Sequence, residues 1–391
     1  MKNAHRVFTV YLEKNRMQQY LNMLKTIMNN GSVRENRTGV DTKGVNFYHI
    51  PFDLEFGKSL PIVTTKRLAH KSVLGELLGF IRGLETAAGF RALDCKIWDA
   101  NANTEGAQPN PWLQNPTRKG TDDLGRIYGA QWRNWEDTKI RPSADVTNAF
   151  YIKEGYEEAA QFLKDGKMYK VWTRRIDQLN HVINTLYHRP TDRRCIVSGW
   201  NPGELNEMSL PPCHLLQHYL CEKLSNEERL AAHITKYESI QIWESNTLEG
   251  VKDRVVKQFK AMNGSDEEKL NDLDAPKYRL DLVMYQRSVD SILGAPYNIT
   301  SYGMMLHMMA RMIGIVPGVL HYVTGDTHIY NNHFDAVQEQ IKRTPVRENV
   351  RFIMKPSLET LKDFERAIPA DFRVFNYQNL GPLNHPTPMA V

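Results

Sequence analysis

The segment that most constrains the fold is "NITSYGMMLHMMARMIGI", residues 298–315, whose spacing predicts a helix that is apolar on most of its sides. Such a helix is stable only where other elements cover it, so we expect it to be deeply buried in a large core. Short β-like runs lie before and after it: "CIVSGW", "CHLLQHYL", "RLDLVMY", "VRFIM" and "FRVF". Strands and helices alternate without a regular βαβα rhythm or a Gly-rich phosphate loop, which predicts a mixed α+β domain.

Two further helices are predicted, over residues 14–28 and within "HKSVLGELLGFIRG". Two charged stretches, 136–175 and 222–278, are helix-prone and poor in motifs, and the second contains "NGSDEEKLNDLDAP", which is typical of a solvated loop. Long surface insertions add little loop-closure entropy. We therefore predict one large domain over 1–391, with these two stretches as surface insertions.

The bulk composition limits the class of partner. The formal net charge of +5 over 391 residues suits an anionic small molecule but is too diffuse to indicate nucleic acid. The N-terminus lacks the apolar region of a secretory signal, and no run approaches the roughly 18 apolar residues of a membrane helix. Four cysteines without C-x-x-C spacing favour free thiols over a disulfide framework or a zinc site. We expect a cytoplasmic protein.

Cys213 in "LPPCHLLQHY" has three interpretations: a nucleophile, a metal ligand, or a small residue that fills the core. His214 is an unsuitable base for it, because adjacent residues of a strand point to opposite faces. If Cys213 is reactive, cationic groups from elsewhere must lower the pKa of its thiol. Candidate groups for this role and for a phosphate monoester are Arg37, Arg193, Arg194, Arg287 and Ser288, each of which could equally be a solvated surface residue.

The roles of three sets of polar residues remain open from the sequence alone. Asp326, His328 and His333 lack the i,i+4 histidine pair of zinc enzymes, and hydrogen bonding of His328 and Tyr330 to a sugar hydroxyl explains "GDTHIYNNH" equally well. Glu76, among the apolar residues of its helix, is either a buried acid–base group or faces water. Asn298 could cap the Met-rich helix or bind the edge of a base.

Nine stretches, in order, strongly resemble the thymidylate synthase superfamily. They are "NRTGVDT", "PIVTTKR", "GELLGFIRG", "IWDANA", "DLGRIYGAQWR", "DRRCIVSGWNPGEL", "LPPCH", "YQRSVDSILGAPYNITSYGMMLHMMA" and "GDTHIYNNH", followed by a similar "PMAV" end. They cover most of 33–135, 176–220 and 279–335. The resemblance implies a mixed sheet packed with helices and an obligate homodimer that pairs sheet to sheet.

The resemblance also implies the ligands and the residues that bind them. Cys213 matches the nucleophile that adds to C6 of dUMP, Glu76 the acid–base carboxylate, and Tyr128 a residue near the C5 proton. Arg37, Arg287 and Ser288 match phosphate ligands, Arg193 and Arg194 match arginines from the partner subunit, and His328 and Tyr330 match deoxyribose ligands. Residues matching contacts of the co-substrate 5,10-methylenetetrahydrofolate are Lys66, Trp98, Asp290, Leu293 and Gly294; no metal is implied. Asn298 matches the asparagine that selects uracil over cytosine, so we expect dUMP rather than dCMP.

Departures from the family pattern concern the wall of the folate site. Asn101 replaces a usual tryptophan, Gly79 another, and Tyr297 a usual phenylalanine. Because reduction needs a dry pocket, these changes predict that water captures the methylene and gives 5-hydroxymethyl-dUMP, as in related phage enzymes. The alternative is thymidylate synthesis in a refilled pocket, since Trp98 and "PMAV" are retained. A cysteine hydrolase and a nucleic-acid-binding member without catalysis are the interpretations from other classes.

Overall fold

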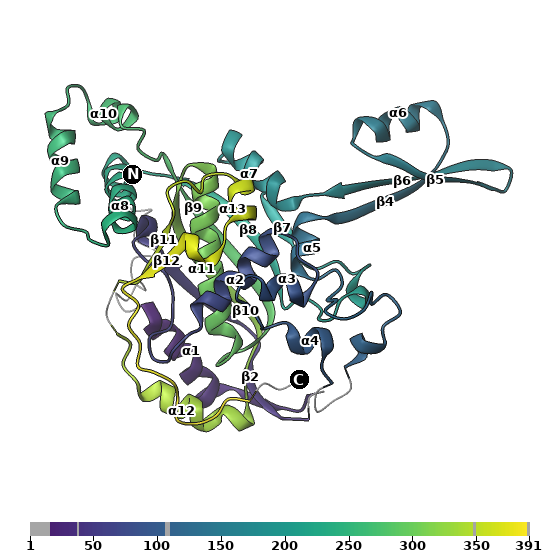
Figure 1. Cartoon of the computed structure of the whole chain (residues 1–391), viewed down its shortest axis with the longest axis horizontal. Coiled ribbons are helices and arrows are strands. Elements are labelled where there is room, and N and C mark those ends of the chain that lie inside the picture. Colours follow the sequence, from purple (N-terminus) through teal and green to yellow (C-terminus); the bar gives the residue numbers. More distant parts are fainter. Residues whose placement is uncertain (1–15, 37–38, 106–109, 347–348, 389–391) are drawn as a thin grey trace.

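The computed structural model describes residues 16–36, 39–105, 110–346 and 349–388. The Met-rich segment forms α11 (Gly294–Ile313), and sixteen of its twenty residues are buried. Gly314 ends the helix at φ 77, a left-handed conformation that glycine adopts without strain. The prediction of a deeply buried helix is confirmed (Figure 1).

A seven-stranded mixed sheet lies against α11. Its order is β1-β2-β10-β9-β8-β7, and β3 also pairs with β10. The strands are β1 (Ser32–Arg34), β2 (Thr42–Val45), β3 (Tyr48–Asp53), β7 (Ile196–Ser198), β8 (His214–Lys223), β9 (Tyr278–Asp290) and β10 (Val316–Tyr330). Strands β9 and β10 are parallel and α11 is the crossover between them, whereas the other pairs are antiparallel. The mixed α+β class is confirmed.

The two faces of this sheet differ. On β9, Leu282 and Met284 are fully buried in the core that also contains the methionines of α11. Val283 and Tyr285 alternate with them on the opposite face, and Tyr285 is 37% exposed. Since neighbouring strand residues point to opposite faces, α11 covers one face of the sheet and leaves apolar side chains exposed on the other.

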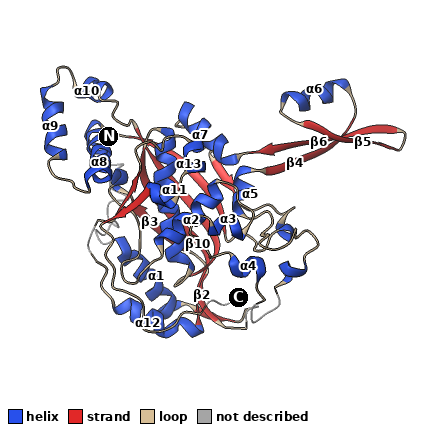
Figure 2. Cartoon of the chain, viewed as in Figure 1, coloured by secondary structure: helices blue, strands red, loops and turns tan. Residues whose placement is uncertain are grey.

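The remaining helices of the body pack around this core (Figure 2). They are α1 (Arg16–Asn30), α2 (His70–Ile81), α3 (Ala87–Arg91), α4 (Asp99–Asn103), α5 (Tyr128–Arg133), α7 (Gln178–His188), α12 (Phe334–Lys342) and α13 (Leu361–Arg366), with short 3-10 turns η1 (Glu55–Gly57), η2 (Pro111–Gln114), η3 (Leu205–Glu207), η4 (Asn331–His333) and η5 (Pro369–Asp371). β11 (Arg351–Met354) pairs with β12 (Phe372–Phe375), as their β-like runs predicted. None of the described helices is long and apolar enough to cross a membrane.

Residues 134–176, which we call the arm, contradict the prediction of a helix-prone stretch. They form the three-stranded sheet β4-β6-β5, with β4 (Trp135–Pro142), β5 (Glu157–Lys164), β6 (Lys167–Ile176) and the short helix α6 (Asp145–Lys153). The arm projects away from the body (Figures 1 and 2). Nearly all of its residues are half-buried or exposed, so the apolar alternation that marks a half-buried strand is weak in its sequence.

The second charged stretch is helical, as predicted, and lies at the opposite end of the long axis (Figure 1). It contains α8 (Asn226–Ser245), α9 (Val251–Ala261) and α10 (Asp266–Asp272). The expectation of a plain loop in "NGSDEEKLNDLDAP" is wrong, because α10 forms there. Ser265 and Glu268 form a capping box, in which each side chain binds the other residue's backbone N–H, and this pair starts α10.

Candidate active site

Cys213 immediately precedes β8, whose first residue, His214, pairs with Gln286 of β9. Arg287 of β9 fixes this turn: its Nε donates to the Pro212 carbonyl at 2.8 Å, and its backbone N–H donates to the Cys213 carbonyl at 2.8 Å. The Arg287 guanidinium also lies beside the thiol, with Nη2 3.7 Å from Sγ. A fixed positive charge at this distance favours the thiolate form of a cysteine.

His214 points into the core, away from this arrangement. Its ring stacks on Tyr128 with centroids 4.0 Å apart, and its Nδ1 lies 2.6 Å from the Tyr302 hydroxyl. Burial lowers the pKa of His214 to about 3, so the imidazole is neutral at physiological pH. This burial agrees with the expectation that His214 is an unsuitable base for Cys213.

Glu76 faces the interior, which decides between the two orientations left open by the sequence. Every residue of α2 from Val73 onward is buried, Glu76 included. Trp98 Nε1 donates to Glu76 Oε1 at 3.0 Å. Burial raises the pKa of Glu76 to about 7, while the hydrogen bond from Trp98 opposes that rise. A carboxyl group with this pKa can both give and take a proton near neutral pH.

Tyr128 joins these groups from the first position of α5. Its hydroxyl accepts a hydrogen bond from the Cys213 backbone N–H at 2.7 Å. Burial raises the pKa of Tyr128 well above its ordinary value, and the charges of Cys213 and Glu76 act in the same direction. Tyr128 therefore contacts the backbone of Cys213, and its ring lies 5.9 Å from that of Trp98, the partner of Glu76. Its hydroxyl stays protonated as a hydrogen-bond donor.

The space beside Gly79 is filled, contrary to the expectation that this glycine admits water. A Cβ atom at Gly79 would lie 2.2 Å from the ring of Phe90, which is fully buried. Phe90 packs edge-on against Phe80, with centroids 5.6 Å apart, and lies 6.0 Å from the ring of Trp98. The ring of Phe90 therefore occupies the volume that a larger side chain at position 79 would take.

Asn298 lies inside α11 and does not cap it, because the helix begins four residues earlier and Leu293 is its N-cap residue. Asn298 Nδ2 donates to Gln286 Oε1 at 3.0 Å, and the Tyr322 hydroxyl donates to the same oxygen at 2.9 Å. Gln286 thus fixes which way the Asn298 amide points. The sequence interpretation missed Gln286, although its position beside Arg287 in "YQRSVD" was a signal for it.

Asp326 connects several predicted substrate ligands. Its Oδ2 accepts from Ser288 Oγ at 3.2 Å and lies 3.0 Å from His328 Nδ1. Its Oδ1 pairs with Arg34 Nη1 at 2.9 Å. Because Asp326 engages Nδ1, the other ring nitrogen of His328 is available to a ligand. Arg34, which lies near "NRTGVDT", was missed by the sequence interpretation.

The two histidines of "GDTHIYNNH" have different surroundings. His333 is fully buried, with Nε2 2.7 Å from the Pro388 carbonyl, whereas the ring of His328 meets Tyr330 edge-on with centroids 5.2 Å apart. Within the described ranges, no group of three or more histidine, cysteine, aspartate or glutamate residues is arranged to hold a metal ion. His328 and Tyr330 lie together at the end of β10, and their binding of a sugar hydroxyl stays a prediction.

Among the described residues, Arg193 and Arg194 do not contact Cys213 of the same chain. Arg193 and Arg194 are exposed just before β7, and the Arg194 side chain is 88% exposed. The Arg193 carbonyl lies 2.9 Å from His218 Nε2. Arg37 lies outside the described residues.

The predicted folate contacts surround the entry to α11 and the Glu76 wall. Lys66 Nζ donates to the Ile292 carbonyl, and burial lowers the pKa of Lys66 to about 8. Asp290 Oδ1 accepts from the backbone N–H groups of Ile292 at 2.9 Å and Leu293 at 3.1 Å, directly before Gly294. These bonds fix the turn that starts the helix.

Two residues of the predicted folate wall are half-buried. Burial raises the pKa of Tyr297, and the charge of Glu76 adds to that rise. Asn101 lies on α4, where its carbonyl accepts from Asn110 Nδ2 at 3.3 Å. Both polar departures from the family pattern are therefore at least partly accessible.

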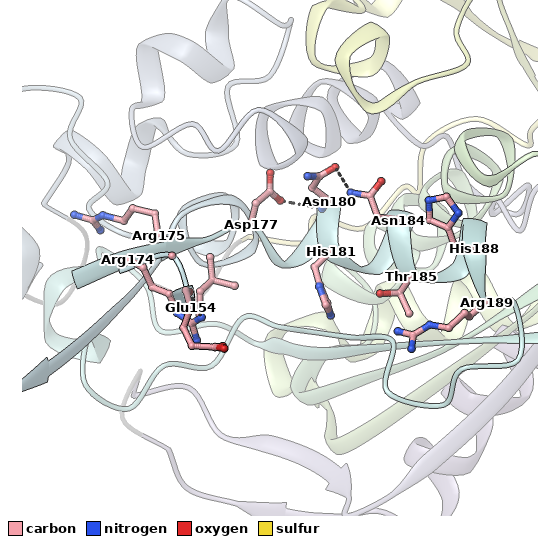
Figure 3. Close-up of a pocket in the computed structure, with 12 residues that line it drawn as sticks. Glu154, Arg174, Arg175, Asp177, Asn180, His181, Asn184, Thr185, His188 and Arg189 are labelled. Atoms are coloured by element: carbon pink, nitrogen blue, oxygen red, sulfur yellow. Dashed lines mark hydrogen bonds between the residues drawn. The ribbon is translucent and has the colours of Figure 1, made fainter. Parts of the chain in front are cut away.

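A surface cleft of about 550 Å³ lies between the arm and α7 (Figure 3). None of the predicted substrate or folate residues that the structure describes lines it. Three of its charged groups are paired with others: Arg175 with Glu136, Asp177 with Arg133, and Arg189 with Asp192. The cleft is therefore separate from the Cys213 site.

Comparison with known proteins defines the class of this site. A family model described as thymidylate synthase matches residues 18–237 and 255–391. A protein of Bordetella parapertussis named thymidylate synthase is 34% identical over 387 residues, covering 96% of this chain and all of the relative. One of Pseudomonas putida with the same name is 33% identical over 384 residues, with the same coverage. A probable thymidylate synthase of Schizosaccharomyces pombe is 31% identical over 370 residues, which cover 94% of this chain and 46% of the relative. The chain belongs to the thymidylate synthase family.

Proposed function

We propose that this enzyme transfers a one-carbon unit from 5,10-methylenetetrahydrofolate to C5 of dUMP and reduces it, which yields dTMP and dihydrofolate. The packing of Phe90 against Gly79 carries the choice of product, because it replaces the lost bulk and helps to exclude water. The relatives named thymidylate synthase support the same product. This proposal replaces the hydroxymethyl product that the sequence departures favoured.

The substrate would bind across the open end of β8, β9 and β10. Arg37, Arg287 and Ser288 would bind the phosphate, and His328 and Tyr330 the deoxyribose hydroxyl. Asn298, with its Nδ2 already bonded to Gln286, has a second N–H for O4 of uracil and a carbonyl oxygen for N3–H. This pattern of donor and acceptor fits uracil and opposes the amino group of cytosine.

The thiolate of Cys213 would attack C6 of the pyrimidine, and the guanidinium 3.7 Å from Sγ supports that ionisation. Bond formation at C6 moves electron density to C5, which makes C5 nucleophilic. Glu76, with its pKa of about 7, would move protons at the pyrimidine, and Tyr128 would hydrogen-bond near C5. The folate, when bound, supplies the one-carbon unit and the reducing equivalents.

The residues present fit a flat heterocycle with polar edges. Trp98 and Tyr297 provide aromatic surface near Glu76, and Asp290 provides a carboxylate for N–H donors. Leu293 and Gly294 would contact the folate at the entry to α11, with Lys66 and Asn101 at the border of the site. The buried ring of Trp98 would help to exclude water from the reacting carbon, whereas Asn101 and Tyr297 add half-buried polar groups to the same wall.

We further propose that two copies pair through the sheet face that α11 leaves exposed. The apolar residues Val283 and Tyr285 on this face support such a contact, as does the exposure of Arg193 and Arg194. In this arrangement the two arginines would reach the phosphate in the partner's site. Mixing Cys213→Ser chains with Arg193→Ala/Arg194→Ala chains should then restore about a quarter of wild-type activity after random subunit exchange. A mixture as inactive as its components would contradict shared sites.

Hydroxymethylation of dUMP is the second candidate function, and the half-buried polar residues Asn101 and Tyr297 favour it. Release of tritium from [5-³H]dUMP in the presence of 5,10-methylenetetrahydrofolate is expected from either reaction. The growth of dihydrofolate absorbance is expected only from reduction. Absence of tritium release from correctly folded protein would reject both reactions and favour the binding protein without catalysis.

A further inference from the structure

The strand register of the arm assigns its side chains to two faces. Trp172 of β6 is buried and stacks on Tyr151 of α6, with centroids 5.6 Å apart, and Tyr156 joins this small core. Lys139 and Glu158 lie opposite Trp172 on the two neighbouring strands, and their side chains share its face. Helix α6 therefore covers this face of the arm.

The opposite face, which we call the outer face, consists of Ile140, Ala160, Phe162, Tyr169 and Val171. Ile140 and Ala160 flank Val171 in one cross-strand row, and Phe162 lies opposite Tyr169 in the next. The rings of Phe162 and Tyr169 stack with centroids 5.6 Å apart. Ile140 is 51% exposed and Phe162 37%, so an apolar surface faces away from α6. Contiguous apolar surface of this kind marks an interaction site.

The charges of the helix-covered face are already satisfied within the chain. Lys139 and Arg174 both pair with Asp137, and Lys170 pairs with Glu158 at 2.6 Å. These cations are therefore not arranged for the phosphates of a nucleic acid. The apolar outer face, by contrast, fits a protein surface of the same kind.

The charges at the two ends of the outer face indicate which protein surface. Lys164 and Lys167 lie opposite each other at the tip of the arm. Glu157 and Glu136 lie toward the body, where Glu136 pairs with Arg175 at 2.7 Å. When two outer faces meet in antiparallel orientation, the lysines of one copy approach the glutamates of the other. A parallel arrangement would place lysine against lysine.

We propose that the outer face binds the outer face of a second copy of this chain in antiparallel orientation. The projection of the arm from the body leaves room for such a contact (Figure 1). From strand spacing and rise, the face measures on the order of 400 Å², about half of what each partner buries in a standard interface. The contact is therefore weak alone and depends on concentration. It does not rest on the proposed catalysis and adds to the sheet-to-sheet pairing.

Sedimentation velocity of the full chain over a hundredfold concentration range tests this contact. The wild type should reach at least twice the mass of its low-concentration species, because each sheet-paired dimer carries two arms. Ile140→Asp/Phe162→Asp should remain at the low-concentration mass, because both side chains are exposed and their replacement breaks the apolar rows. Val146→Asp on α6 is the matched control: Val146 is 85% exposed and lies off the outer face, so this variant should associate like the wild type. Equal behaviour of wild type and the double variant would overturn the proposal.

Charge variants test the orientation of the two copies. Lys164→Glu/Lys167→Glu and Glu136→Lys/Glu157→Lys should each weaken self-association, and an equimolar mixture of the two should associate again. If each variant associates as the wild type does, or if the mixture stays apart, the antiparallel arrangement is wrong. Tritium release should remain at the wild-type rate in all of these variants, which separates this test from that of the proposed reaction.

Discussion

The body that carries Cys213 and the arm place polar and apolar side chains in opposite ways. In the body, Glu76 and Asn298 are held beside aromatic or apolar groups by specific hydrogen bonds. In the arm, the ion pairs of Asp137 and Glu158 lie on the face that α6 covers, and the apolar side chains of Ile140 and Phe162 are exposed on the other. Burial of polar groups shifts pKa values and orients donors, whereas an exposed apolar face provides a contact surface. We therefore expect single substitutions in the body to reduce the reaction rate far more than substitutions in the arm.

The largest effect is expected at the thiol. Cys213→Ser replaces a thiolate by a hydroxyl that Arg287 cannot ionise, so tritium release should fall at least about a thousandfold. Cys221→Ser is the matched control, since Cys221 is a half-buried cysteine of β8 and lies outside the proposed site. A Cys213→Ser enzyme with more than a tenth of wild-type activity would remove the covalent step from the account.

Glu76→Gln should lower kcat by about a hundredfold or more, because the amide cannot transfer a proton. The steady-state rate with dUMP and folate measures this change, and its pH profile distinguishes the role of the residue. In the wild type, the profile should contain an ionisation near the Glu76 pKa of about 7. That ionisation should be absent from the residual activity of the variant; its persistence would assign it to another group.

The same carboxyl group should make stability depend on pH. Burial raises the pKa of Glu76 from its ordinary value of 4.5 to about 7, so the folded state holds the proton more tightly. Relative to Glu76→Gln, the wild type should lose on the order of 3 kcal/mol of unfolding free energy as the pH rises from about 4.5 through about 7. Urea titrations measure the unfolding free energy of both proteins across this pH range. If the two free energies change with pH in the same way, Glu76 is not a buried carboxyl group with a raised pKa.

Asn298→Asp should change the choice of base. The carboxylate cannot donate to O4 of uracil, and it places an acceptor against Gln286 Oε1, so kcat/KM for dUMP should fall roughly tenfold to a hundredfold. The amino group of cytosine can donate to the carboxylate, so the preference should shift toward dCMP. Competition between the two nucleotides measures the shift, and an unchanged preference would remove Asn298 from base selection.

Phe90→Leu should open the wall beside Gly79 and let some of the reaction end in hydroxymethylation. We expect a fewfold rise in the ratio of 5-hydroxymethyl-dUMP to dTMP, measured by mass spectrometry. Phe364→Leu is the control for general loosening, because Phe364 is equally buried and lies outside the proposed site. If both variants give the same product ratio as the wild type, Phe90 does not exclude water from the reacting carbon.

The smallest effect on catalysis is expected in the arm. Trp172→Ala removes the centre of the cluster that Tyr151 and Tyr156 complete, so the arm should lose order and become sensitive to protease. Tritium release should stay within about twofold of the wild type, because no predicted ligand lies in the arm. A large loss of activity in folded protein would show that the arm contributes to catalysis in the body, which we treat as independent of it.

The sequence predicted the body better than the arm for a physical reason. Helix α11 and the inward position of His214 follow from apolar patterns that burial imposes on neighbouring residues. The arm has few buried positions, so its strands leave a weak pattern and were expected to be helical. Two details of the site depend on contacts between distant segments and were missed: Phe90 fills the space at Gly79, and Gln286 orients Asn298.

The measurement that tests the central claim most directly is the mass of the nucleotide formed from dUMP and 5,10-methylenetetrahydrofolate. The closed wall at Phe90 predicts dTMP, heavier than dUMP by CH₂, together with an equimolar amount of dihydrofolate. A product heavier by CH₂O, with no dihydrofolate formed, would contradict the account and return the function to hydroxymethylation.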